Sequence, residues 1–271
     1  MFQVIEVSLA DAWRFLQFKR SSEFEVSFNL KGFDYLWILN ARPWNPGDRI
    51  LDVGCGYSRF PIYMADHYGC EVWAGDDFGL SSGDEYWTRG KAPQEHFQKY
   101  PQVKFLLERL GDQEQSSLPV NYFDCIYSAS TLEHVPPEMI GRVWKHMDAL
   151  LKPGGDLLHA VEMRLPTQRG VVSLFKAFIL DYLGFLVPPG YRLANAFFTP
   201  KSYIGHVRRG LDAHIPSPAS QVGPLKMALD PGVVLEPIDW AYNRMVKDGS
   251  NRVTITRMTS LLLHLKKAGQ D

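Results

Sequence analysis

The stretch from Gly47 to Phe78 reads GDRILDVGCGYSRFPIYMADHYGCEVWAGDDF, and it is the strongest indication of the fold. An apolar run at residues 49–52 ends in an acid, and two glycines around a cysteine follow it. A helical pattern comes next, and a second apolar run then ends in two aspartates. Short apolar strands that alternate with helices predict a mostly parallel sheet that is covered on both faces.

The ends of these two strands carry the residues of a nucleotide-type cofactor site. In an open parallel sheet, ligands lie beyond the carboxyl ends of the strands. Gly54 and Gly56 allow the backbone to turn tightly and to approach a ligand. An acid about 20 residues further on, here Asp76 or Asp77, would accept hydrogen bonds from ribose hydroxyls. The stretch therefore predicts a cofactor with a ribose.

The alternation of strand and helix continues through most of the chain. We predict an α/β fold with a doubly wound, mostly parallel seven-stranded sheet, an N-terminal helical cap and an insertion after the fifth strand. The expected parts are a cap at 1–46, a cofactor-binding core at 47–164, a helical lid or insertion at 165–199 and a C-terminal completion of the sheet at 200–271. Further strands are expected at 232–240 and 259–268, and helices at 93–100, 136–151, 171–187 and 199–210.

Three features separate this stretch from a dinucleotide site. The G-x-G-x-x-G fingerprint needs a third glycine for close packing of helix on strand, but Arg59 stands there. Asp52, just before the first glycine, would repel a pyrophosphate but suits a cationic amino-acid moiety. The stretches FDCIYSASTLEHV and LLKPGGDLL then follow in order. A dinucleotide-dependent dehydrogenase is therefore a distant alternative.

On these motifs the chain resembles the class I S-adenosylmethionine-dependent methyltransferases. ILDVGCGYS is similar to the first motif of that family, and VWAGDD to its acid-ended second strand. FDCIYSASTLEHV is similar to the fourth strand and its loop, and LLKPGGDLL to the turn into the fifth strand. The resemblance covers residues 47–162 and, loosely, the last two strands. Ser58 departs from the pattern, because the family more often has a third glycine there.

The resemblance implies S-adenosylmethionine as the cofactor and S-adenosylhomocysteine as the product. The residues that it places around the methionine portion are Asp52, Gly54, Cys55 and Gly56, with Ser128 and Ala129 at the end of the fourth strand.

The same resemblance implies which residues hold the nucleoside portion of the cofactor. Asp76 would take the ribose, and the alternative is Asp77, which would place Phe78 against the adenine. Asp112, in the loop after the third strand of the core, would meet the adenine amino group. Glu108 is the fallback for that role, since this loop is longer than usual.

Methyl transfer to an oxygen atom also needs a general base, because a hydroxyl must lose its proton. His134 follows the fourth strand, and the ordinary pKa of histidine, near 6.5, suits a base near neutral pH. A structural reading is that Glu133 and His134 brace the start of the next helix. Glu162, at the end of the fifth strand, is expected to contact the acceptor or to anchor a loop. His159 is expected to be buried and hydrogen-bonded, and we predict no metal site.

The composition limits the classes of partner. The chain has 271 residues and is 45% hydrophobic, enough for one large core. Its 29 basic and 30 acidic residues leave a net charge of −1, so no nucleic-acid partner is expected. The three cysteines show no metal-ligand spacing and indicate a reducing compartment. We find no secretory signal and no run of roughly 18 uncharged apolar residues, so we expect a cytoplasmic protein without a transmembrane segment.

These patterns together predict a methyltransferase that acts on a small or medium-sized organic acceptor, most simply on oxygen. The Asn/Asp-Pro-Pro-aromatic signature of exocyclic base amine methylation is absent after the fourth strand, where SAST stands instead. The alternatives are a methyltransferase of RNA or protein, and a binding or regulatory module without catalysis. The helical pattern at 171–187 is expected to be a lid, with an interfacial helix or a homodimer contact as the other readings.

Overall fold

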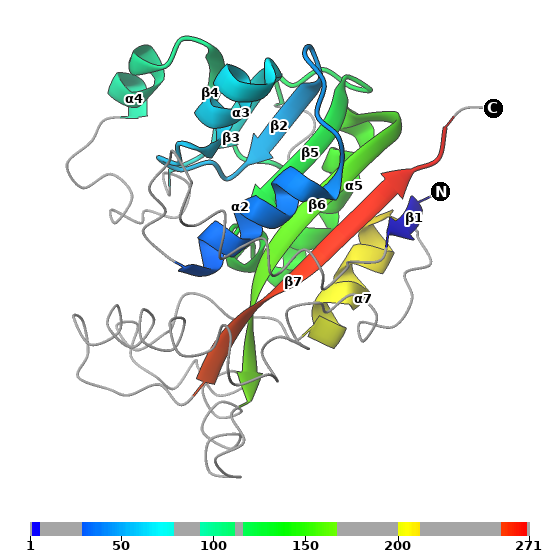
Figure 1. The fold of residues 1–271 in the computed structure, drawn as a ribbon. Coiled ribbons are helices and arrows are strands. Elements are labelled where there is room, and N and C mark those ends of the chain that lie inside the picture. The colour runs from blue at the N-terminus through cyan, green and yellow to red at the C-terminus, as the bar shows by residue number, and fades with distance from the viewer. Residues whose placement is uncertain are drawn as a thin grey trace, which may run out of the picture.

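The computed structural model describes residues 2–5, 29–78, 93–111, 116–166, 200–211 and 256–269. Its strands form one seven-stranded sheet in the order β1-β7-β6-β5-β2-β3-β4 (Figure 1). The strands are β1 (Phe2–Ile5), β2 (Arg49–Val53), β3 (Glu71–Asp76), β4 (Val103–Leu107), β5 (Phe123–Ala129), β6 (Leu151–Pro166) and β7 (Thr256–Lys267). The helices are α2 (Asn29–Ala41), α3 (Phe60–Tyr68), α4 (Pro93–Lys99), α5 (Pro137–Leu150) and α7 (Pro200–Leu211), with a short 3₁₀ helix, η1 (Leu132–His134).

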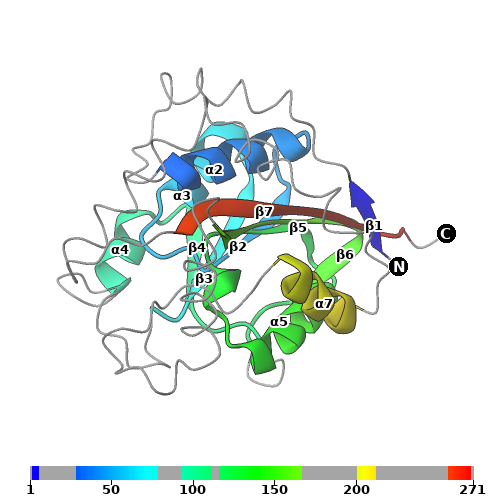
Figure 2. The same cartoon turned by 90° about the horizontal axis from the view of Figure 1, so that it is seen from below.

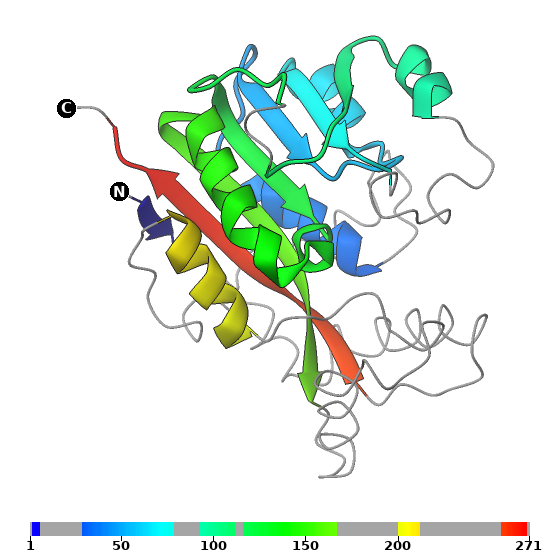
Figure 3. The same cartoon turned by 180° about the vertical axis from the view of Figure 1, so that it is seen from behind.

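The sheet is mostly parallel, as the sequence predicts. All pairs from β4 through β3, β2 and β5 to β6 are parallel, whereas β7 runs antiparallel to both β6 and β1. Helices α2 and α3 cover one face, and α5 and α7 cover the other (Figures 2 and 3). Each face has its own apolar core, one around Phe60 and Ile38 and the other around Trp144 and Tyr203. The predicted doubly wound α/β fold is therefore confirmed.

The strand order reverses next to β2, and this places the site. Ile50 and Leu51 of β2 are fully buried, because the strand lies in the middle of the sheet with helices on both faces. From β2 the chain continues to β3 and β4 on one side, and then returns to β5 on the other. Such a switch point opens a ligand site beyond the carboxyl ends of the flanking strands, here β2 and β5.

Two local expectations were wrong. Residues 2–5, expected within a helical cap, form β1 and pair with β7 from Phe2 opposite Lys267 to Ile5 opposite His264. Four residues carry little local signal, and the partner strand lies at the other end of the chain. The KPGG stretch, expected to precede the fifth strand, lies within β6, where the pairing with β5 is irregular between Phe123 and Cys125. The expected helix at 171–187 and strand at 232–240 lie outside the described residues.

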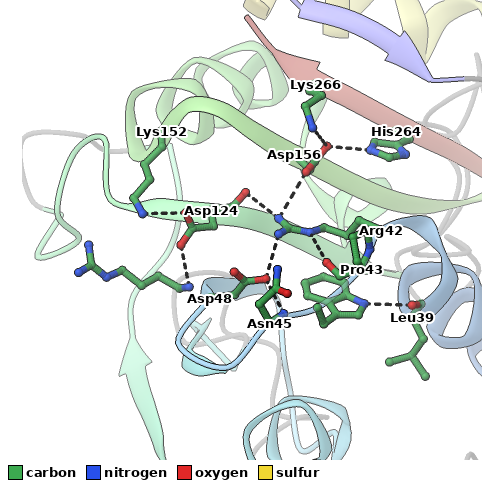
Figure 4. Close-up of polar contacts among 12 residues, drawn as sticks. Leu39, Arg42, Pro43, Asn45, Asp48, Asp124, Lys152, Asp156, His264 and Lys266 are labelled. Atoms are coloured by element: carbon green, nitrogen blue, oxygen red, sulfur yellow. Dashed lines mark hydrogen bonds and ion pairs between the residues drawn. The ribbon is translucent and has the colours of Figure 1, made fainter. Parts of the chain in front are cut away.

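A group of charged side chains, here called the Arg42 network, lies at the amino ends of β2 and β5, the edge of the sheet opposite the carboxyl ends of these strands (Figure 4). The guanidinium of Arg42 contacts Asp48 at 2.9 Å and Asp156 at 3.3 Å, and donates to the carbonyl oxygen of Asp124 at 3.1 Å. Nε2 of His264 lies 2.9 Å from the carboxylate of Asp156. The network therefore ties the end of α2 to β5, β6 and β7. Within the described part of the chain, no helix is long and apolar enough to cross a bilayer.

Candidate functional site

The carboxylate of Asp76 links the ends of the two strands with which the sequence analysis began. Asp76 is the last residue of β3, and Oδ2 accepts the N–H of Gly56 at 2.8 Å. Oδ1 accepts the N–H of Phe78 at 2.6 Å. The structure thus brings Asp76 to the glycine loop after β2, whereas Asp77 lies one residue beyond the strand.

Gly54 is held against the loop that follows β5. Its φ is +74°, and its N–H donates to the carbonyl oxygen of Gly75 at 2.8 Å. A Cβ on Gly54 would lie 2.0 Å from Cγ2 of Thr131, whose hydroxyl donates to the carbonyl oxygen of Gly54 at 3.1 Å. Glycine is therefore needed at position 54 for two reasons: the turn has a positive φ, and the side chain of Thr131 occupies the space of a Cβ. The sequence pattern alone did not show the second reason.

Helix α2 supplies two site residues that sequence reasoning missed. The hydroxyls of Tyr35 and Ser58 lie 2.9 Å apart, and Ser58 also accepts the N–H of Phe60 at 3.1 Å. The buried Asp34 accepts a hydrogen bond from the hydroxyl of Ser130 at 3.4 Å. The one signal in the sequence was Ser58 itself, because a serine in place of glycine brings a hydroxyl that must find a partner.

The loop carries buried negative charge. Asp52 is 3% exposed. Burial and, next, the nearby Asp52 raise the pKa of Tyr35 and Tyr127. Burial, then Asp52 and Asp76, raise the pKa of the Cys55 thiol well above its ordinary value. The phenols and the thiol therefore stay protonated at neutral pH, and the acids give the loop an electrostatic environment that fits a cationic ligand.

At the end of β5, the predicted cofactor-side residues Ser128 and Ala129 are both buried. The hydroxyl of Ser128 lies 2.8 Å from Nδ1 of His159 in β6. Burial lowers the pKa of His159 to about 3, so its ring is neutral. His159 is thus the buried, hydrogen-bonded histidine that the sequence predicts. Ser130, the next residue, has a φ of +54°, a conformation unusual for a residue with a side chain and frequent at functional sites.

His134 stands at the surface with a buried carboxylate beside it. Its side chain is 40% exposed, and Nε2 lies 3.9 Å from Oε1 of Glu133, whose side chain is 1% exposed. Both residues belong to η1, directly beyond β5. The other catalytic candidate, Glu162, lies in β6 opposite Ser260 of β7, and the contacts of its side chain lie outside what the structure describes.

On the side expected for adenine, Phe78 is fully buried at the end of β3. Asp112 lies outside the described residues. Glu108, the fallback for the adenine amino group, accepts hydrogen bonds from the hydroxyl of Ser116 and from the N–H and hydroxyl of Ser117 at 3.0 and 2.7 Å. Its carboxylate therefore closes the loop after β4. Among the residues that the structure describes, no cluster of three or more His, Cys, Asp or Glu is placed to hold a metal.

The fold, its switch point and an acid-ended β3 beside a glycine loop agree with a family model. Residues 50–155 match the model of the methyltransferase domain. This match supports a class I S-adenosylmethionine-dependent methyltransferase. The matched range begins in β2 and ends in β6, so it contains both loops of the site.

Several known proteins are similar to this chain. Phosphoethanolamine N-methyltransferase 3 of Arabidopsis thaliana is 31% identical over 134 residues, which are 45% of this chain, and the chain spans only 22% of that protein's length. Ubiquinone biosynthesis O-methyltransferase of Acinetobacter baumannii is 26% identical over 203 residues, which cover 74% of this chain and 77% of that protein. Phosphoethanolamine N-methyltransferase 2 of Haemonchus contortus, solved with phosphomonomethylethanolamine and S-adenosylhomocysteine, has a TM-score of 0.53. It is 14% identical, with 97% of this chain and 61% of that chain covered, so the likeness shows the fold alone.

Proposed function

We propose that this methyltransferase transfers a methyl group to an oxygen atom of a small or medium-sized organic acceptor. The observation that carries the proposal is the exposed imidazole of His134 at the carboxyl end of β5, beside the buried carboxylate of Glu133. An imidazole supplies a base to an acceptor hydroxyl at neutral pH. The relative from Acinetobacter, an O-methyltransferase by name, aligns over 74% of this chain and supports oxygen as the attacked atom.

The residues present fit S-adenosylmethionine, which supplies an electrophilic methyl group on a positively charged sulfur when it is bound. The carboxylate of Asp52 and the backbone from Gly54 to Gly56 would hold the methionine portion. Asp76 would hold the ribose with the carboxylate oxygens that accept the Gly56 and Phe78 amides. The residues that would surround the rest of the cofactor are Phe78 and Asp112 at the adenine, and Ser128 and Ala129 at the end of β5.

The side chains near the methyl group then have separate tasks. His134 would accept the proton of the acceptor hydroxyl, and the carboxylate of Glu133, 3.9 Å from Nε2, would stabilise the imidazolium that forms. The raised pKa of Cys55 keeps its thiol protonated, so that it does not compete for the methyl group as a thiolate. Glu162 would contact the acceptor from β6. The protein thus supplies alignment and one proton acceptor, which is what an in-line displacement on a good leaving group needs.

The test is methyl transfer from radiolabelled S-adenosylmethionine to a panel of acceptors. The panel contains phenols, catechols and enols as hydroxyl acceptors, and ethanolamine and phosphoethanolamine as amine acceptors. We expect transfer to a hydroxyl and a loss of about 10²–10⁴-fold in His134→Ala, with the Kd for S-adenosylhomocysteine unchanged by calorimetry. The matched control is His67→Ala, which removes an exposed histidine at the end of α3.

Other outcomes would redirect the proposal. Transfer to amines alone would replace oxygen by nitrogen as the attacked atom. Binding of S-adenosylhomocysteine without transfer to any acceptor would favour a binding module, and transfer only to RNA or protein would favour the macromolecular alternative. A protein that does not bind S-adenosylhomocysteine would overturn the proposal altogether. The homodimer and the cytoplasmic location stay predictions from the sequence.

A further inference from the structure

Thr131 joins the glycine loop after β2 to the turn that carries His134. It lies between β5 and η1. The hydroxyl of Thr131 donates to the carbonyl oxygen of Gly54 at 3.1 Å and to that of Ala129 at 3.3 Å. The backbone carbonyl oxygen of Thr131 accepts the N–H of His134 at 3.0 Å. Thr131 therefore holds the glycine loop through its side chain and His134 through its backbone.

The two loops are packed tightly at this point. A Cβ on Gly54 would lie 2.0 Å from Cγ2 and 2.5 Å from Oγ1 of Thr131, so the threonine side chain lies directly against the glycine. On either side of Thr131 the turn is attached elsewhere. The N–H of Ser130 donates to the carbonyl oxygen of Ala160 at 3.0 Å, and Leu132 is fully buried in the core on the α5 face. The turn is thus fixed to β6 and to the core, and Thr131 links it to the glycine loop.

We propose that Thr131 is a positioning residue for methyl transfer, because it fixes the imidazole of His134 relative to the glycine loop. The inference rests on the proposed function, in which this loop holds the methionine portion of the cofactor and His134 accepts the proton of the acceptor. Thr131 is assigned no contact with either ligand. It acts by setting the distance between the base and the reacting atoms, where a displacement of about 1 Å can cost about 10²-fold in rate.

Valine has a shape similar to that of threonine but no hydroxyl, so Thr131→Val breaks this link. The carbonyl oxygen of Gly54 then loses its donor and faces a methyl group, and the two loops separate. The glycine loop stays attached to β3, because the N–H of Gly54 donates to the carbonyl oxygen of Gly75 at 2.8 Å. The N–H of Gly56 likewise keeps Asp76 as its acceptor. The change should therefore lower the rate of transfer more than the affinity for the cofactor.

The test is a double-mutant cycle on the rate of methyl transfer at saturating S-adenosylmethionine, with the hydroxyl compound that the acceptor panel identifies. Thr131→Val should lower the rate by about tenfold or more in the wild-type protein. In a His134→Ala background it should lower the rate by less than about twofold, because the base that it misplaces is already gone. Thr131→Ser keeps the hydroxyl and should keep most of the rate. By calorimetry, the Kd for S-adenosylhomocysteine should rise by less than about threefold in Thr131→Val.

The matched control is Val143→Ala, which removes buried atoms from α5 but leaves the link through Thr131 in place, and it should keep the wild-type rate. Equal losses in the two backgrounds overturn the inference alone, as does a Thr131→Ser protein that is as slow as Thr131→Val. A Kd that rises as much as the rate falls also overturns it, because Thr131 would then act on cofactor binding. A His134→Ala protein with the full rate, or a wild-type protein that methylates no hydroxyl, overturns the proposed function and this inference together.

Discussion

At Gly54, both the backbone conformation and a neighbouring side chain disfavour any residue with a Cβ. A Cβ there would lie 2.0 Å from Cγ2 of Thr131, at a φ of +74°. We expect Gly54→Ala to lower the free energy of unfolding by about 2–4 kcal/mol, from the strained backbone together with the clash. A Thr131→Gly background removes Cγ2, Oγ1 and also Cβ, which would lie 2.7 Å from the added atom, so the same change should cost about 1–2 kcal/mol there. Urea denaturation of the four proteins measures both costs, and equal costs would show that Thr131 is not the obstacle.

Burial lowers the pKa of His159 to about 3, and this makes the stability of the fold depend on pH. The unfolded chain takes up a proton near pH 6.5, but the folded protein does not until about pH 3. The free energy of unfolding should therefore decrease as the pH is lowered through this window, by up to about 1.4 kcal/mol per pH unit. Asparagine at position 159 can keep a hydrogen bond to Ser128 but does not titrate. Between pH 7 and pH 5, the free energy of unfolding of His159→Asn should therefore decrease by about 2 kcal/mol less than that of the wild-type protein.

Denaturant titrations at pH 7, 6 and 5 measure this difference. His159→Asn also removes part of a buried ring, so its stability at pH 7 is expected to be lower, and only the slope with pH is informative. His67→Asn, at an exposed position of α3, should keep the wild-type slope. Parallel pH profiles for His159→Asn and the wild-type protein would rule out His159 as the source of acid sensitivity.

The helices and strands that could be predicted from the sequence are those with a clear local pattern of apolar residues. The strands on either side of α3, and helices α5 and α7, show clear apolar periodicity between turn residues, and all of them were found. Strand β1 was not found, because its four residues become a strand only through a partner at the far end of the chain. In the site, the motif marked Asp76, but the contact of Tyr35 with Ser58 exists only because α2 packs on the sheet.

Substitutions of Arg42 test how strongly the Arg42 network attaches α2 to the sheet. Its guanidinium side chain is 15% exposed and contacts Asp48 and Asp156, whose side chains are 14% and 6% exposed (Figure 4). Removal of one partner from a buried ion pair leaves the other charge poorly compensated. We expect Arg42→Ala to lower the free energy of unfolding by about 3 kcal/mol, and Arg42→Lys to cost less because a charge remains.

Urea denaturation measures these costs. The Arg42 network lies at the edge of the sheet opposite the glycine loop, so the affinity of the folded variants for S-adenosylhomocysteine should be unchanged. A cost below about 1 kcal/mol for Arg42→Ala would mean that the network is as weak as a surface ion pair. A weaker affinity in a folded variant would show that the two edges are coupled.

Over the whole molecule, charge is distributed differently at the two edges of the sheet. At the edge with the Arg42 network, the buried Asp156 lies within 4 Å of arginine, histidine and lysine side chains. At the cofactor edge, burial and, next, the nearby Asp52 raise the pKa of Tyr127, and Asp76 accepts hydrogen bonds from backbone amides. Acids that face backbone amides and protonated phenols gain more from a cationic ligand than acids already paired with basic side chains. The distribution therefore favours binding of a cationic cofactor at one edge of the sheet.

Ligand binding at the cofactor edge should also change the stability of the whole chain. A ligand that binds only the folded state at 100 times its Kd adds about 2.7 kcal/mol, which raises the Tm of a protein of this size by about 5 °C. We expect S-adenosylhomocysteine to produce this shift in the wild-type protein and little shift in Asp76→Asn, which would weaken the proposed ribose contact. Asp66→Asn, an exposed change on α3, is the matched control and should keep the full shift. Thermal unfolding with and without ligand measures all three proteins, and a full shift in Asp76→Asn would mean that another group holds the ribose.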